Sequence, residues 1–248
     1  MTEDTAVTKT PTLDDPIRPT MKNPALERSA EPTLRPRGDT DRPTMQRPGS
    51  TTTSTRKTAV LVGLAFLTAT FTFAIGNALI HSYFSSATSH DGTLIAGVFL
   101  LGCDGVAVVA NGLAMRRVLT PHAPIRSQAY FVLRVAECVT VVVIGVYFLT
   151  SQTRWDAYVL PVYAVSGAAG LVLSSALLTS RIVPRSLSML GVIGYPVFLV
   201  GSILAMFSVI DVTHGAGTLA LVPGGLFELI LPIWLFTKGF TSHQIEPR

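Results

Sequence analysis

Six long apolar runs constrain the fold of this chain more than any other feature of its sequence. Each run holds about 20 or more residues, enough to cross a hydrocarbon core of about 30 Å at about 1.5 Å of rise per residue. The runs cover roughly residues 58–80, 92–115, 128–150, 157–180, 187–210 and 217–237. One such run would also suit a buried helix of a soluble protein. Six in succession, joined by short polar loops, predict an all-α polytopic membrane protein with six transmembrane helices.

The first 57 residues have a different composition. They are rich in Pro, Thr and Arg, hold few large apolar residues, and carry ten Lys and Arg against eight Asp and Glu. Such a segment cannot bury enough apolar surface to offset the entropy lost on ordering. We therefore predict a disordered N-terminal tail over 1–57 and a six-helix transmembrane domain over 58–240. A secretory signal peptide is not expected, because 57 polar residues precede the first apolar run.

The basic residues predict the orientation of the helices. The tail, the second and fourth loops and the C-terminus hold 17 of the 19 Lys and Arg, whereas the other three loops hold only Arg154. By the positive-inside rule, both termini should face the cytoplasm, and the protein should be a multi-pass protein of the plasma or inner membrane. The lipid bilayer is then the expected partner. The positive charge lies in the loops and ends that are expected to face the cytoplasm. Membrane topology therefore explains it, and it gives no support to nucleic-acid binding.

Four ionisable residues interrupt the apolar runs: Asp104, Arg134, Glu137 and Glu228. A charge at the centre of a membrane helix costs about 2.5–3.5 kcal/mol on insertion scales, so such residues usually face each other or a wet cavity. Asn111 lies seven residues after Asp104, on the same helix face. We predict that these five residues form an intramembrane polar cluster with a binding or a structural role.

Charge and depth sharpen this prediction. The three carboxylates should lie at similar depth near the midplane, and Arg134 should share a helix face with Tyr130 and Glu137. If the faces meet, one guanidinium can bridge two or three carboxylates. Three carboxylates and one arginine leave a formal charge of −2. We therefore expect at least one carboxyl to hold a proton near neutral pH.

Proline and glycine residues within the apolar runs predict local features of the helices. Pro196 and Pro232 are predicted to break or to kink their helices, because a proline cannot donate to the carbonyl four residues earlier. For Pro232, that carbonyl belongs to Glu228. Gly167 and Gly170 are predicted to allow close approach between helices.

The sequence lacks the motifs of several enzyme classes. It contains no HExxH, Walker A or GxGxxG pattern, and its five His residues all fall in loops or at predicted helix ends. Haem ligation inside the bundle and a membrane Ser–His pair are therefore not expected. We expect a non-enzymatic protein without a metal or another cofactor.

Three short runs resemble a known family. Residues 180–191 read SRIVPRSLSMLG, residues 133–137 read LRVAE, and Phe227-Glu228 precedes Trp234. Together, over about residues 56–241, they resemble a bacterial integral-membrane family described as domain of unknown function 4386. The resemblance implies a six-helix membrane fold and implicates Arg134, Glu137 and Glu228, and it implies no activity.

Two function classes remain open from the sequence. In the first, the protein is a small transporter, expected to be a homo-oligomer, whose carboxylate and arginine cluster binds a small polar solute or a proton. In the second, it is a non-enzymatic membrane scaffold or regulator, and the same cluster is a structural ion-pair network.

Overall fold

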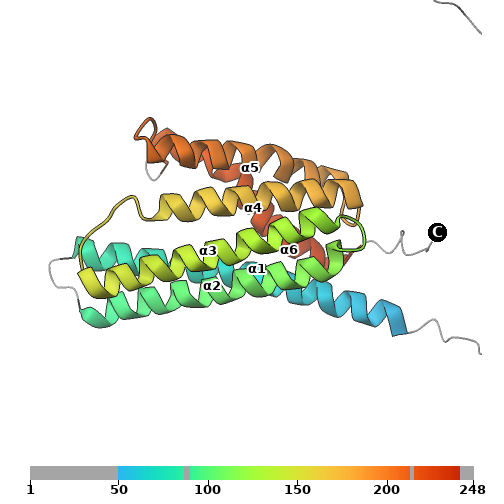
Figure 1. The fold of residues 1–248 in the computed structure, drawn as a ribbon, viewed down its shortest axis with the longest axis horizontal. Helices are drawn as coiled ribbons and strands as arrows, with labels where there is room; N and C mark the ends of the chain where they lie inside the picture. The colour runs from blue at the N-terminus through green and yellow to red at the C-terminus, as the bar shows by residue number, and fades with distance from the viewer. Residues whose placement is uncertain (1–49, 87–89, 213–214, 241–248) are drawn as a thin grey trace, which may run out of the picture. The chain divides into compact units, whose positions relative to one another are not determined.

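The computed structural model describes residues 50–86, 90–212 and 215–240. Within these ranges the chain forms six α-helices and one short 3-10 helix and no strand, which confirms the all-α expectation (Figure 1). The elements are α1 (Ser50–Ser85), α2 (Asp91–Leu119), α3 (Pro124–Ser151), α4 (Val159–Ser180), α5 (Arg185–Met206), η1 (Gly215–Ala220) and α6 (Val222–Thr237).

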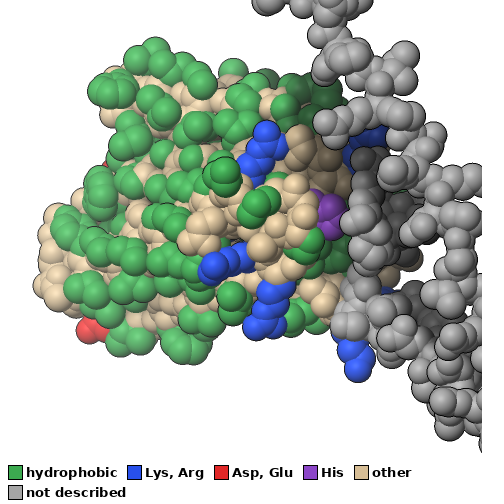
Figure 2. Space-filling view, turned by 45° about the vertical axis from the view of Figure 1, so that its right-hand side comes forward, with side chains coloured by type: hydrophobic (Ala, Val, Ile, Leu, Met, Phe, Trp, Pro, Cys, Tyr) green, Lys and Arg blue, Asp and Glu red, His purple; other side chains and the backbone are tan. Residues whose placement is uncertain are grey.

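The six helices form a closed ring. Each helix packs against the next one in the chain, and α6 returns to pack against α1. Six helices are long and apolar enough to cross a membrane, which confirms the predicted number. Figure 2 shows apolar side chains covering the side of the bundle, while Lys and Arg gather toward one end. This distribution suits a bundle whose sides face lipid.

Several helix boundaries differ from the sequence prediction by four residues or more; α6, for example, begins at Val222 rather than at residue 217. Helix α1 begins at Ser50, eight residues before the predicted start at residue 58. The α-helix satisfies its own backbone hydrogen bonds, so it can continue past the apolar run into a polar segment. Residues 1–49, the remainder of the predicted tail, lie outside the described part of the chain.

Helix α5 ends at Met206 rather than at residue 210, because the chain turns into a left-handed conformation at Ser208 (φ 58°). The Ser208 amide donates to the Ala205 carbonyl at 2.9 Å, and the Val209 amide donates to the Leu204 carbonyl at 2.9 Å. This pair of bonds is the Schellman termination of a helix. The usual glycine of that motif is replaced here by serine.

The two prolines do not break their helices, which corrects the sequence prediction. Pro196 lies inside a continuous α5 and Pro232 inside a continuous α6. Each proline removes only one backbone donor, which would otherwise bond to the carbonyls of Val192 and Glu228 respectively. Packing against the neighbouring helices holds the remaining turns in place.

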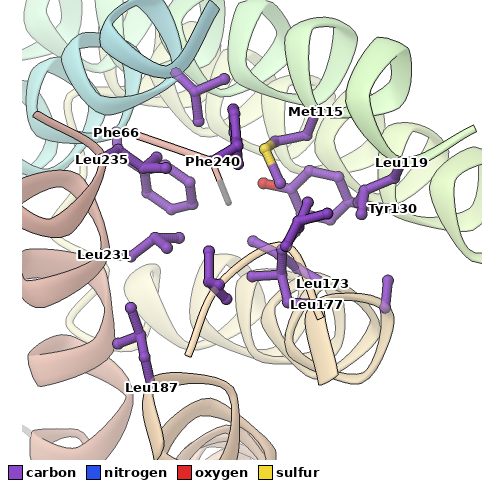
Figure 3. Packing of buried hydrophobic residues seen from close by; sticks show 14 of the residues in the cluster. Phe66, Met115, Leu119, Tyr130, Leu173, Leu177, Leu187, Leu231, Leu235 and Phe240 are labelled. Carbon is purple, nitrogen blue, oxygen red and sulfur yellow. The ribbon is translucent and has the colours of Figure 1, made fainter. Parts of the chain in front are cut away.

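Buried apolar residues form one cluster toward each end of the ring. The first lies at the basic end, which we define by the α2–α3 and α4–α5 connections and by Arg116, Arg117, Arg126, Arg181 and Arg185. Figure 3 shows this cluster, in which Phe66, Tyr130, Leu177 and Leu235 come from different helices. The second cluster lies at the opposite end, beside the α1–α2 and α3–α4 connections. Polar residues lie between the two clusters.

Candidate functional site

A cavity of about 230 Å³ lies inside the ring, and all six helices contribute to its wall. The structure brings the five residues of the predicted polar cluster together here: Asp104, Asn111, Arg134, Glu137 and Glu228. A cavity of this size and polarity has room for several water molecules or a small solute. The five residues therefore surround a space instead of closing on one another.

Arg134 is held by groups of its own helix. Its Nη1 lies 2.6 Å from Oε2 of Glu137, three residues later, and its Nε donates to the Tyr130 hydroxyl at 3.0 Å. The guanidinium carbon also lies 5.2 Å from the centre of the Tyr130 ring and 5.8 Å from that of Phe66. The arginine thus makes one ion pair among the described residues, and the expected bridge to two or three carboxylates is not formed.

The other two carboxyl groups are more loosely held. The Tyr195 hydroxyl donates to Oε1 of the partly exposed Glu228 at 3.3 Å. Asp104 is only 3% exposed, and it forms neither a hydrogen bond nor an ion pair within the described residues. It interacts through space with the charges of Glu137, Arg134 and Glu228. A buried carboxyl without a direct partner is costly, so it points to an occupant of the cavity.

The side chain of Asn111 contains a buried oxygen that accepts no hydrogen bond from the described part of the chain. The residue is 1% exposed and lines the cavity, and its Oδ1 accepts no hydrogen bond from any described group. An unsatisfied buried acceptor costs about 1–3 kcal/mol. A water molecule or a ligand with a donor would remove that cost.

Close approach of α2 and α3 positions these groups. A Cβ atom on Gly112 would lie 3.0 Å from Cβ of Arg134, closer than most such contacts, so glycine favours this close approach of the two helices. As a result the neighbouring Asn111 and the Arg134–Glu137 pair line one wall of the cavity.

Aromatic rings form another part of the wall. The ring of Tyr163 lies 5.9 Å from that of Phe73 and 5.5 Å from that of Phe198, in tilted and edge-to-face contacts. The sequence analysis missed these three residues and Tyr195. A signal was present, because Phe73 repeats Phe66 at a spacing of seven, and a tyrosine within an apolar helix usually has a partner for its hydroxyl.

A second cavity, of about 570 Å³, lies at the opposite end of the ring, and we call it the vestibule. Polar residues there include Arg154, whose Nε lies 2.5 Å from Oδ1 of Asp156, and Asn77, which accepts a hydrogen bond from the Tyr158 hydroxyl. Tyr163 and Leu221 line both the vestibule and the inner cavity. These two side chains therefore stand between the buried carboxylates and that end of the protein.

The chain was compared with known proteins by sequence and by structure. No curated protein and no solved structure matches it. The model of the family "Domain of unknown function (DUF4386)" matches residues 146–239, from the end of α3 to the end of α6. The match confirms the resemblance to that family and includes residues 180–191 and Phe227-Glu228, whereas residues 133–137 lie outside it.

Proposed function

We propose that this protein is a small membrane transporter that binds a cationic solute in its inner cavity, in competition with protons. The observation that carries the proposal is a cavity whose wall contains the buried carboxyl of Asp104 beside the amide of Asn111, whose Oδ1 has no hydrogen-bond partner among the described residues. A purely structural network would be expected to satisfy its polar groups internally.

The sign of the charge supports a cation. Asp104, Glu137 and Glu228 line the cavity together with one arginine, so full ionisation would leave a net charge of −2 in a place with little water. A cation or one or more protons would neutralise this excess. A transported cation that displaces a proton gives the coupling on which many carriers depend.

The two cavities support an access route. The vestibule lies on one side of Tyr163 and Leu221 and the carboxylates lie on the other. Toward the basic end, the first apolar cluster fills the ring with close-packed side chains such as Leu177 and Leu235 (Figure 3). One accessible side and one sealed side are the arrangement expected for a single state of an alternating-access carrier.

We also propose that the basic end faces the cytoplasm, so that the vestibule faces outward. Support comes from Arg116, Arg117, Arg126, Arg181 and Arg185, which lie at one end of the bundle. Single cysteines at Arg117 and at Asp156, in a chain whose native Cys103 and Cys138 are replaced by Ala, would test this. Only the cysteine at position 156 should react with an impermeant thiol reagent added outside intact cells, and the reverse pattern would overturn the orientation.

Transport can be tested with the full chain in liposomes that contain a pH-sensitive dye. Outward gradients of sodium, potassium, choline or tetraethylammonium should each be tried, and at least one should drive proton uptake that protein-free liposomes do not show. The Asp104→Asn and Glu228→Gln proteins should lose that uptake. The control is Asp91→Asn, which removes an exposed carboxyl at the start of α2, outside the cavity.

The outcomes separate transport from the structural alternative. If none of the four cations moves protons, the transport proposal is wrong. If Asp104→Asn and Glu228→Gln fail to give folded protein, while the unaltered protein binds and moves no cation, the cluster is a structural network of a scaffold or regulator.

A further inference from the structure

The aromatic wall of the inner cavity gives an indication of which cation would bind there. We propose that the cavity binds an organic ammonium ion, with its charge near Asp104 and Glu228 and its alkyl groups against the rings of Phe73, Tyr163 and Phe198. This inference rests on the proposed function and adds the chemical class of the solute.

The first step of the argument is the composition of the wall. Beside the polar cluster, the cavity is lined by apolar and aromatic side chains, among them Phe66, Phe73, Val108, Val162 and Phe198. A small inorganic cation prefers a shell of about six to eight oxygen ligands. Alkyl groups on an ammonium ion instead gain from contact with apolar surface, while the charge is attracted to the faces of aromatic rings.

The second step asks which aromatic rings of the cavity already lie beside a cation of the chain. Phe66 and Tyr130 already lie beside the guanidinium of Arg134, at 5.8 and 5.2 Å. No Lys or Arg of the described chain lies over Phe73, Tyr163 or Phe198. These three rings line the cavity and meet in one tilted and one edge-to-face contact, so no cation of the described chain competes there with a cation in the cavity.

The third step is a hydrogen-bond acceptor that has no donor among the described groups. Oδ1 of Asn111 is fully buried without a hydrogen bond from a described group, on the same cavity wall as Asp104. Many organic ammonium ions carry an N–H or O–H donor beside the charge. Choline, for example, would place its alkyl ammonium group against the rings and carry a hydroxyl to this oxygen.

Binding to the purified full-length protein in detergent tests the proposal. The probes are choline, tetraethylammonium and 3,3-dimethylbutan-1-ol, which has the shape of choline without its charge. We expect saturable binding of at least one of the two ammonium ions and none of the neutral alcohol. Equal binding of the neutral alcohol would show a merely apolar site and would overturn the proposal.

Variants in the aromatic wall locate the site. Phe198→Leu and Phe73→Leu should each weaken ammonium binding by about threefold to thirtyfold, the range for losing one desolvated cation–aromatic contact. The matched control is Phe99→Leu, which makes the same change at a ring that is 69% exposed on the outside of α2. Tyr163→Phe, which keeps the ring, should bind normally, whereas Tyr163→Leu should not. Unchanged affinity in both Phe198→Leu and Phe73→Leu would contradict the inference.

A labelling experiment distinguishes a wrong ammonium assignment from a wrong transport proposal. A hydrophobic carbodiimide labels protonated carboxyls, and any occupant of the cavity should slow its reaction at Glu228 or Asp104. Protection by sodium or potassium but not by choline or tetraethylammonium would overturn the ammonium assignment and leave a cation transporter. No protection by any of the four ions, together with no cation-driven proton uptake, would overturn both.

Discussion

Gly170 of α4 lies directly against the ring of Tyr195 of α5. A Cβ atom on Gly170 would come within 2.0 Å of that ring, and the hydroxyl of the same tyrosine donates a hydrogen bond to Glu228 of α6. A residue with no side chain on α4 therefore determines how a carboxyl group on α6 is held. The sequence predicted a packing role for Gly170, and the structure identifies the ring against which it packs.

The first prediction concerns Gly170→Ala. The added methyl group cannot fit while the Tyr195 ring keeps its place, so the ring must shift and its hydroxyl must leave Glu228. Overpacking of this kind costs about 1–3 kcal/mol. We expect a lower midpoint of thermal unfolding in detergent and weaker cation binding. The control is Gly102→Ala in α2, because nothing lies within 4 Å of a Cβ atom at that position. If both variants unfold at the same temperature, the contact with Tyr195 does not constrain the fold.

The second prediction compares two carboxyl groups. Glu137→Gln leaves the guanidinium of Arg134 buried without its ion-pair partner, and breaking a buried pair in this way costs about 3–5 kcal/mol. Glu228→Gln removes the carboxyl but keeps an oxygen that can accept the single 3.3 Å hydrogen bond from Tyr195. The amount of folded protein and the unfolding midpoint should fall much further for Glu137→Gln. Equal losses would mean that Glu228 also stabilises the ring of helices.

The sequence was sufficient to predict the helices and the polar residues of the site. Apolar runs of bilayer length determine the six helices, and the high cost of charge in lipid singles out Asp104, Arg134, Glu137 and Glu228. The partners of these residues could not be predicted, because they depend on helix rotation and tilt. Arg134 and Glu137 are three residues apart and meet within one helix, whereas the contact between Tyr195 and Glu228 requires two helices to pack in one register.

The aromatic wall and the helix ends were missed in the sequence for a different reason. A phenylalanine at position 73 or 198 has the same propensity whether it faces lipid or a cavity, so only the packed ring of helices distinguishes the two. The end of α5 was placed too late because Phe207, Val209 and Ile210 continue the apolar pattern. The left-handed turn at Ser208 ends the helix without the glycine or proline that usually marks such a point.

The third prediction follows from that turn. Ser208 has φ 58°, a conformation in which a Cβ atom is strained and glycine is not. We expect Ser208→Gly to stabilise the protein by about 0.5–1 kcal/mol, seen as a higher unfolding midpoint. Ser208→Ala keeps the Cβ atom and should give no such gain. A lower midpoint for the glycine variant would show that the serine side chain itself stabilises the turn.

The fourth prediction concerns alkaline pH. Burial, and secondarily the nearby hydroxyl of Tyr163, raises the pKa of Tyr158, which precedes α4, above its ordinary value of 10.0. The folded protein therefore holds this proton more tightly than the unfolded chain does. The resulting stability is complete below pH 10 and is lost as the pH rises through the folded-state pKa. Ionisation would also end the hydrogen bond that the Tyr158 hydroxyl donates to Asn77.

The measurement for Tyr158 is the unfolding midpoint as a function of pH, together with tyrosinate absorbance. The stability of the unaltered protein should fall more steeply above pH 10 than that of Tyr158→Phe, which has no proton to lose. Tyr83→Phe, at a tyrosine whose hydroxyl meets the exposed Asp91 at 3.5 Å, is the matched control and should keep the steep fall. Identical curves for the unaltered protein and Tyr158→Phe would contradict the prediction.

The fifth prediction concerns Tyr163, which lines both the vestibule and the inner cavity. Its ring contacts Phe73 and Phe198 and lies where the two cavities share their lining, so we expect it to slow the passage of a reagent from the vestibule to Asn111. In a chain without its native cysteines, an Asn111→Cys thiol should react slowly with a cationic thiol reagent added on the vestibule side. Adding Tyr163→Ala should speed that reaction at least tenfold, because removing the ring joins the two cavities. Adding Phe148→Ala instead, which removes a ring from the apolar cluster at the same end, should leave the rate unchanged. A rate that is insensitive to Tyr163→Ala would mean that solutes reach the carboxylates by another path.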